Sequence, residues 1–86
     1  MATKSRELSP AWESITSGTE NAVIQVRNGV IEWCDYDAIP DVDLVAHTSD
    51  NFIVAGPPLK IWVRAVTPGK SGIPGYTRIV VTKWQD

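Results

Sequence analysis

The sequence predicts an all-β protein: a small antiparallel β-sandwich or barrel of about six to eight short strands with an extended N-terminal arm. Short runs rich in β-branched residues recur at intervals of about 8–12 residues, and an Asn-Gly pair separates two of them. No stretch carries an apolar stripe with the 3.6-residue period of a helix. Eighty-six residues suffice for one domain and not for two. We therefore expect an arm over residues 1–11 and one domain over residues 12–86.

The first ten residues are polar and show almost no periodic apolar pattern. We expect this arm to be mobile in isolation and to become ordered only when a partner binds it. Order is expected to begin at Trp12, with a short strand over residues 12–16. Residues 17–21 are of types that tolerate tight backbone geometry, and they predict a turn.

The clearest local signal is a hairpin at Asn28–Gly29, between strands over residues 22–27 and 30–34. Asn-Gly is the favoured pair of a type I′ turn, in which both central residues have positive φ. A two-residue turn fixes the register, so that Val26 faces Ile31. Side chains alternate along each strand. The predicted inner face carries Ile24, Val26, Ile31 and Trp33, and the outer face carries Gln25, Arg27 and Glu32.

Four further strands are expected after the hairpin. The acidic segment 35–43 predicts a loop, because Pro40 blocks regular pairing. Segment 67–75, with two Pro and three Gly, predicts a long flexible connection. The third of the four strands alternates clearly, with Ile61 and Val63 on one face. The expected strands cover residues 44–47, 51–54, 60–66 and 76–84.

Composition argues against several classes of function. The formal net charge is −2, with basic and acidic residues well mixed, so no basic patch points to nucleic acid. The apolar runs are far shorter than the roughly 20 residues that span a bilayer, and the polar N-terminus does not resemble a signal peptide. We expect the protein to stay in the cytoplasm where it is made, or to leave it only as part of a larger assembly.

Small chains usually need additional stabilisation, because roughly 40% of the unfolded surface stays exposed after folding at this size. Cys34 is the only cysteine, so a disulfide within the chain is excluded. The sequence shows no cluster of His and Cys that could hold zinc. Self-association is the remaining route, and we expect a homo-oligomer.

The candidate catalytic and metal-binding residues are better explained by structural roles. We expect no catalytic residue, no cofactor and no metal. His47 is the only histidine, and the sequence offers it no nucleophile or second acid. Cys34 has Glu32 and Asp35 close by, and negative neighbours make a thiol a poorer nucleophile. A solvated acidic loop is favoured over a calcium site because the spacing differs from an EF-hand. Its carboxylates are Asp35, Asp37, Asp41 and Asp43.

Four tryptophans are unusual in so short a chain. The hairpin register places Trp33 in the core. Trp62 shares a strand face with Lys60 and Arg64, which indicates exposure, and Trp12 follows the arm. Exposed Trp commonly anchors a protein interface or stacks on a sugar ring.

Three runs of the sequence resemble small proteins encoded among the virion genes of tailed bacteriophages. They are residues 12–29, the segment Lys60-Ile61-Trp62-Val63-Arg64-Ala65, and the closing Ile79-Val80-Val81-Thr82. The similarity covers roughly residues 12–82 and consists of strand and turn patterns. It implies a capsid decoration (cement) protein or a neck, fibre or tail accessory protein, a homo-oligomer, often a trimer, and a terminal arm that grips the shell.

The leading hypothesis is a non-enzymatic virion structural protein that binds a major capsid protein or another virion protein. The alternative is a carbohydrate-binding or fibre-associated module, with Trp62 and Tyr76 as stacking platforms. An enzyme is the third and weakest hypothesis. The residues expected at the protein interface are Lys4, Arg6, Trp12, Trp62 and Arg64.

Overall fold

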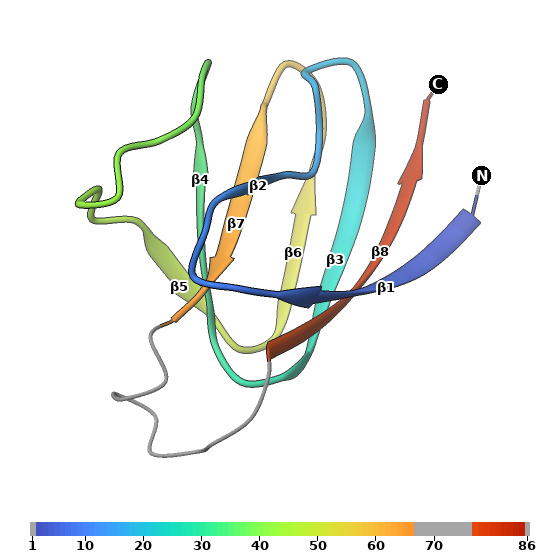
Figure 1. Cartoon of the computed structure of the whole chain (residues 1–86). Helices are drawn as coiled ribbons and strands as arrows, with labels where there is room; N and C mark the ends of the chain where they lie inside the picture. The colour runs from blue at the N-terminus through green and yellow to red at the C-terminus, as the bar shows by residue number, and fades with distance from the viewer. Residues whose placement is uncertain (1, 67–76, 86) are drawn as a thin grey trace.

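The computed structural model describes residues 2–66 and 77–85, and over these residues the chain forms eight strands and no helix. The strands make two four-stranded sheets that pack face to face (Figure 1). Each described pairing is antiparallel, which confirms the predicted all-β sandwich. Sheet A has the order β1 (Ala2–Leu8), β8 (Thr77–Trp84), β3 (Asn21–Asn28) and β6 (Phe52–Ala55). Sheet B has the order β2 (Glu13–Ser14), β7 (Ile61–Ala65), β4 (Ile31–Asp35) and β5 (His47–Ser49).

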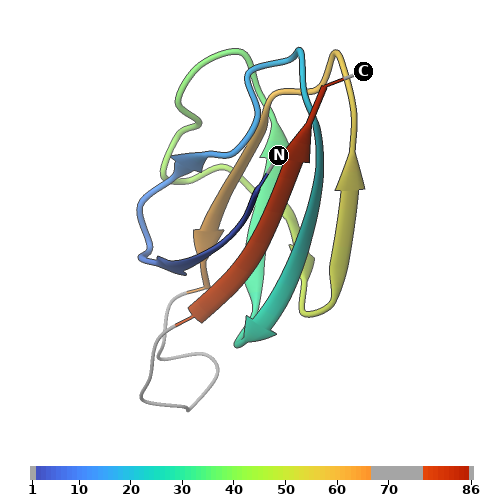
Figure 2. The same cartoon turned by 90° about the vertical axis from the view of Figure 1, so that its right-hand side faces the viewer.

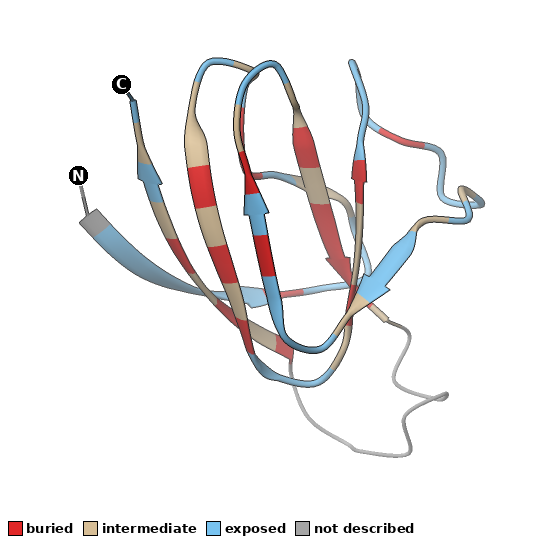
Figure 3. Cartoon of the chain, turned by 180° about the vertical axis from the view of Figure 1, so that it is seen from behind, coloured by how far each residue is buried: buried red, intermediate tan, exposed pale blue. Residues whose placement is uncertain are grey.

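The core lies between the two sheets and is built almost entirely from aliphatic side chains. Buried and less buried residues alternate along β3, β6 and β8, as expected for strands with one face on a core (Figure 3). Four isoleucines from four strands are fully buried at its centre: Ile24, Ile31, Ile61 and Ile79. The predicted alternation in β7 is confirmed, with Ile61, Val63 and Ala65 facing inward.

The predicted hairpin at Asn28–Gly29 is wrong, because β3 and β4 lie in different sheets. Gly29 has a φ of 78°, whereas no described residue other than glycine has a positive φ, so the turn is not type I′. Ile24, Val26 and Ile31 are nevertheless buried as predicted, and Trp33 packs against the core. The chain crosses from sheet A to sheet B at this point, and the two strands face each other across the core.

The pairing of strands around β3 agrees with this crossing. β3 pairs with β8 along one edge and with β6 along the other, so β4 has no edge of β3 to join. The pairing with β8 is irregular between Val26 and Asn28, where the strand begins to leave the sheet. Gly29 then packs so closely on Thr77 that a Cβ atom would lie 2.8 Å from the Thr77 hydroxyl oxygen.

The expectation of an N-terminal arm that awaits a partner is also corrected. β1 pairs with β8 of the same chain along seven residues, from Ala2 opposite Lys83 to Leu8 opposite Thr77. Leu8 is buried in the core. Figure 2 shows β1 and β8 lying side by side. Residues 2–8 are thus a strand of the sandwich, because β8 offers them a full-length edge.

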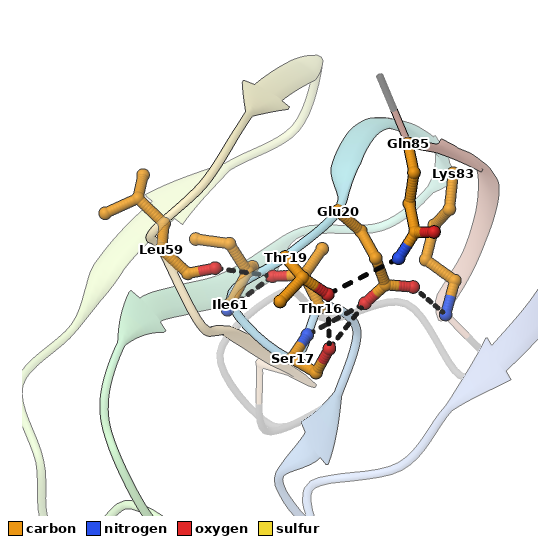
Figure 4. Close-up of polar contacts among 8 residues, drawn as sticks. All are labelled: Thr16, Ser17, Thr19, Glu20, Leu59, Ile61, Lys83 and Gln85. Carbon is orange, nitrogen blue, oxygen red and sulfur yellow. Dashed lines mark hydrogen bonds and ion pairs between the residues drawn. The ribbon is translucent and has the colours of Figure 1, made fainter.

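The remaining elements differ from prediction mainly at their boundaries. The strand expected over residues 12–16 is reduced to two residues in β2, and the one expected over 44–47 begins at His47. Thr16 is buried and fixes the end of sheet B (Figure 4). Its hydroxyl donates to the Leu59 carbonyl at 2.9 Å and accepts from the Ile61 amide at 3.0 Å. Segment 67–75 lies outside the described residues.

Substitution of Gly29 by Ala tests the crossing. The variant needs a positive φ at an L-residue and pushes a methyl group against Thr77, so we expect a loss of about 1–3 kcal/mol in the free energy of unfolding. Asn28→Ala is the matched control, with an expected loss within about 0.5 kcal/mol. Urea unfolding measures both. Equal losses at the two positions would contradict the crossing and favour a type I′ hairpin.

Candidate functional site

The inner face of β1 is the part of the sandwich that sheet B leaves uncovered. Lys4 lies opposite Val81 and Arg6 lies opposite Ile79, so both basic side chains share the sheet face that forms the core further along. β1 runs away from the strands of sheet B toward the N-terminus (Figure 1). Lys4 and Arg6 are therefore exposed although they occupy inward-facing positions.

A groove of about 250 Å³ lies along this uncovered face. We call it the basic groove, and it is lined by Lys4, Arg6, Val81 and Lys83. Three cationic side chains thus surround one apolar residue. Arg6 is 3.5 Å from a carboxylate oxygen of Glu13, and Lys83 is 3.5 Å from one of Glu20. Such exposed pairs are weak, so a bound anion can compete for both cations.

Glu20 holds one end of the basic groove through a short polar network (Figure 4). One carboxylate oxygen accepts hydrogen bonds from the Ser17 amide at 2.9 Å and the Ser17 hydroxyl at 3.0 Å, and the other pairs with Lys83. The hydrogen bond from the Ser17 amide is the main cause that lowers the pKa of Glu20, and Lys83 lowers it further. Glu20 therefore remains a carboxylate and orients Lys83.

A second hollow of about 330 Å³ is also bordered by Lys83. It is lined by Glu20, Lys83, Trp84 and Gln85, and Trp84 is half-buried. The Gln85 amide donates to the Thr19 hydroxyl at 3.4 Å, which joins the end of β8 to the turn before β3. Lys83 thus lines both hollows.

Arg64 organises the outer face of sheet B. It is nearly buried, and its Nε donates to a Glu32 carboxylate oxygen at 2.7 Å. The two terminal nitrogens donate to the carbonyls of Val42 at 2.9 Å and Leu44 at 3.3 Å. The guanidinium carbon lies 4.3 Å from the ring centre of Trp12, a cation–π geometry. These contacts hold the 36–46 loop against the sheet.

The two tryptophans predicted at an interface support the same loop. The Trp12 indole N–H donates to the Asp41 carbonyl at 3.1 Å, and the Trp62 indole N–H donates to the Tyr36 carbonyl at 3.0 Å. Both residues are half-buried. The exposed large apolar side chains of this region are on the loop itself: Tyr36, Ile39, Val42 and Val45.

The five residues predicted at an interface therefore fall into two groups. Lys4 and Arg6 meet in the basic groove, whereas Trp12, Trp62 and Arg64 meet under the 36–46 loop. Contact of any of them with a partner stays a prediction. Tyr76, the second platform of the carbohydrate hypothesis, lies outside the described residues.

Lys83 is the residue of the groove that sequence reasoning missed. It lies opposite the buried Ala22, and it follows Ile79 and Val81 at the inward-facing positions of β8. A charged residue at an inward position of a strand indicates where the core ends. The sequence contains this signal, because Lys83 follows Ile79 and Val81 at every second position of the strand.

The acidic loop uses two of its carboxylates to contact Lys60. An oxygen of Asp35 accepts from the Lys60 amide at 2.8 Å, and Asp37 lies 3.6 Å from the Lys60 ammonium. Within residues 2–66 and 77–85, no three side chains of His, Cys, Asp or Glu are grouped to hold a metal ion. Calcium binding therefore gains no support from the placement of these carboxylates.

Cys34 is buried near the end of β4, whereas His47 is exposed on β5. Burial raises the pKa of the Cys34 thiol, and the neighbouring Asp35 raises it further. Burial raises this pKa more than Asp35 does, whereas the sequence indicated only the effect of the negative neighbours. The His47 ring packs on Trp33 with ring centres 4.6 Å apart.

Comparison with protein-family models, with curated proteins and with solved structures gives no match. In the described part of the chain, no helix is long and apolar enough to cross a membrane.

Replacement of Glu20 by Gln tests the network at the groove. Because the folded protein lowers the pKa of Glu20, its carboxylate stabilises the fold at pH values above about 4.5, its ordinary pKa. That stabilisation is lost as the pH falls through the lowered pKa. We expect the wild type to be more stable than Glu20→Gln at pH 7, with the difference vanishing in acid. Thermal unfolding from pH 2 to pH 7 measures it, and a difference independent of pH would contradict this assignment.

Replacement of Arg64 by Ala tests the anchor of the 36–46 loop. The change leaves Glu32 and two loop carbonyls without their donor, so we expect a loss of about 2–3 kcal/mol in unfolding free energy. Amide hydrogen exchange over residues 36–46 should also accelerate. Arg27→Ala, at an exposed arginine, is the control, with an expected effect within about 0.5 kcal/mol. Unchanged exchange in the loop of Arg64→Ala would contradict the anchoring role.

Proposed function

We propose that this protein is a non-enzymatic structural component of a bacteriophage virion that binds a larger protein lattice through the basic groove. The convergence of Lys4, Arg6 and Lys83 around Val81 carries the proposal. The strand and turn patterns that resemble small virion proteins of tailed phages supply the biological setting. A capsid decoration protein is the form we favour, with the major capsid protein as partner.

The chemistry of the groove suits an acidic segment of a partner protein. Lys and Arg side chains donate hydrogen bonds to carboxylates, and an apolar floor can contact the adjoining aliphatic carbons. Lys4 and Arg6 lie on an edge strand, so a partner can also reach the free backbone groups of β1. The groove thus provides the grip that the sequence resemblance assigns to a terminal arm.

Repetition over a lattice compensates for the weakness of each site. Exposed ion pairs contribute little singly and are screened by salt. When many copies are linked into one assembly, each further contact forms at high effective concentration. A small groove with three cations is sufficient in that setting.

Co-sedimentation tests this function. The purified chain is mixed with shells assembled from the major capsid protein of the phage that encodes it, and the bound fraction is measured by centrifugation. We expect binding that weakens between low and high salt, and at least a tenfold loss in Lys4→Glu/Arg6→Glu. Arg27→Glu is the matched control, because Arg27 is exposed and does not line the groove.

Two results would overturn the proposal. One is a wild-type chain that stays in the supernatant with these shells. The other is full binding by the doubly reversed variant, which would remove the groove from the interaction. A glycan array probed with the wild type and with Trp62→Ala distinguishes the carbohydrate alternative, which requires binding that the substitution abolishes.

A further inference from the structure

Strand β6 is an edge of sheet A with unusual composition. Phe52 and Val54 are 56% and 72% exposed, and its four residues include no charge, no proline and no glycine. Natural edge strands are usually protected by charged residues, by proline or by a covering segment. The opposite edge of the same sheet, β1, carries Lys4, Arg6 and Glu7. The two edges of sheet A therefore differ in kind.

The register of β6 on β3 shows which backbone groups face outward. The Val26 amide donates to the Asn51 carbonyl at 2.8 Å, and Gln25 lies opposite Phe52. Hydrogen-bonded and non-bonded pairs alternate in an antiparallel ladder. Ile53 and Ala55 therefore direct their N–H and C=O groups toward β3. Phe52 and Val54 direct theirs away from the sheet.

The same two residues present apolar side chains on the outer face of sheet A. Val54 lies opposite Val23, and Phe52 lies opposite Gln25, whose partner on the other side is Val80. Val23 and Val80 are half-buried. The outer face beside the free edge thus carries three apolar side chains and Phe52 around Gln25, and in Figure 3 no described segment lies over β6.

We propose that β6 pairs with β6 of a second copy of this chain, in an antiparallel arrangement with a two-fold axis at Ile53. Phe52 of each copy then lies opposite Val54 of the other, and their outward N–H and C=O groups form four hydrogen bonds. Sheet A becomes a continuous eight-stranded sheet in the dimer. The apolar side chains of both copies meet on its outer face.

Self-complementarity selects a second copy as the occupant. A two-fold interface requires that one patch fit itself, and β6 does so in backbone register and in charge. Asp50, the nearest charged residue in sequence, falls opposite Gly56 of the other copy, so no like charges meet. Pairing of β6 with β1 of another copy would instead place Phe52 and Val54 beside Thr3, Ser5 and Glu7.

The proposed dimer is independent of the basic groove, which lies at the other edge of sheet A. The sequence predicts self-association, and the proposed dimer names the strand through which it occurs. A dimer with two-fold symmetry differs from the trimer that the resemblance implies. A four-residue edge covers less surface than the about 1,600 Å² of a standard interface. We therefore expect a weak dimer whose population depends on the protein concentration.

Sedimentation velocity over a range of concentrations tests this inference. The wild type should pass from one 9.4 kDa chain to two as its concentration rises. Val54→Lys places like charges beside the axis and should weaken the dimer at least tenfold. Val54→Pro removes an outward N–H without touching the bonds to β3 and should do the same. Val45→Lys is the matched control, since Val45 is an equally apolar, 95% exposed residue of the 36–46 loop.

Hydrogen exchange of the wild type gives a readout that needs no variant. The amides of Phe52 and Val54 should exchange more slowly as the concentration rises, whereas Val45 should not change. A monomer at every concentration, a trimer, or a dimer that both Val54 variants leave intact would overturn the pairing. None of these outcomes bears on binding to capsid shells, so failure here and failure of the proposed function are distinguishable.

Discussion

The crossing of the chain at Gly29 determines where the other strands can lie. Gly29 adopts a positive φ against Thr77 and carries the backbone from sheet A to sheet B. β3 then has both edges free, and β6 and β8 occupy them. Each connection except the one between β4 and β5 joins the two sheets. The core is consequently built from residues far apart in sequence, and neither sheet can form its buried face without the other.

The alternation of the sequence predicted which residues point inward and could not predict which strands pair. Ile24, Val26 and Ile31 are buried whether the two strands form a hairpin or face each other across a core, since both arrangements preserve a period of two. The Asn-Gly pair favoured the hairpin on local grounds. The competition of β6 and β8 for β3 is non-local, and a short sequence window does not contain it. β1 was missed for the same reason, because its partner lies at the other end of the chain.

The candidate site shows the same limit. Lys4 and Arg6 were predicted as contact residues from their place near the N-terminus, but only the pairing of β1 with β8 brings Lys83 beside them. Arg64 was predicted at a protein interface, and within the chain its guanidinium donates to the carbonyls of Val42 and Leu44. Backbone carbonyls have no residue signature, so the sequence contains no pattern from which such bonds could be predicted.

The two edges of sheet A differ because they face different physical demands. Residues 3–7 of β1 lie beyond the cover of sheet B and are exposed on both faces, so charged residues there cost little and prevent indiscriminate pairing. β6 has one buried face, which Ile53 and Ala55 form. Its outer face carries Phe52 and Val54, although polar residues there would protect the edge and leave the core unchanged. Apolar residues at such an edge are costly in an isolated monomer and favourable in a pair, and this difference is why we propose self-association at β6 rather than at the charged edge of β1.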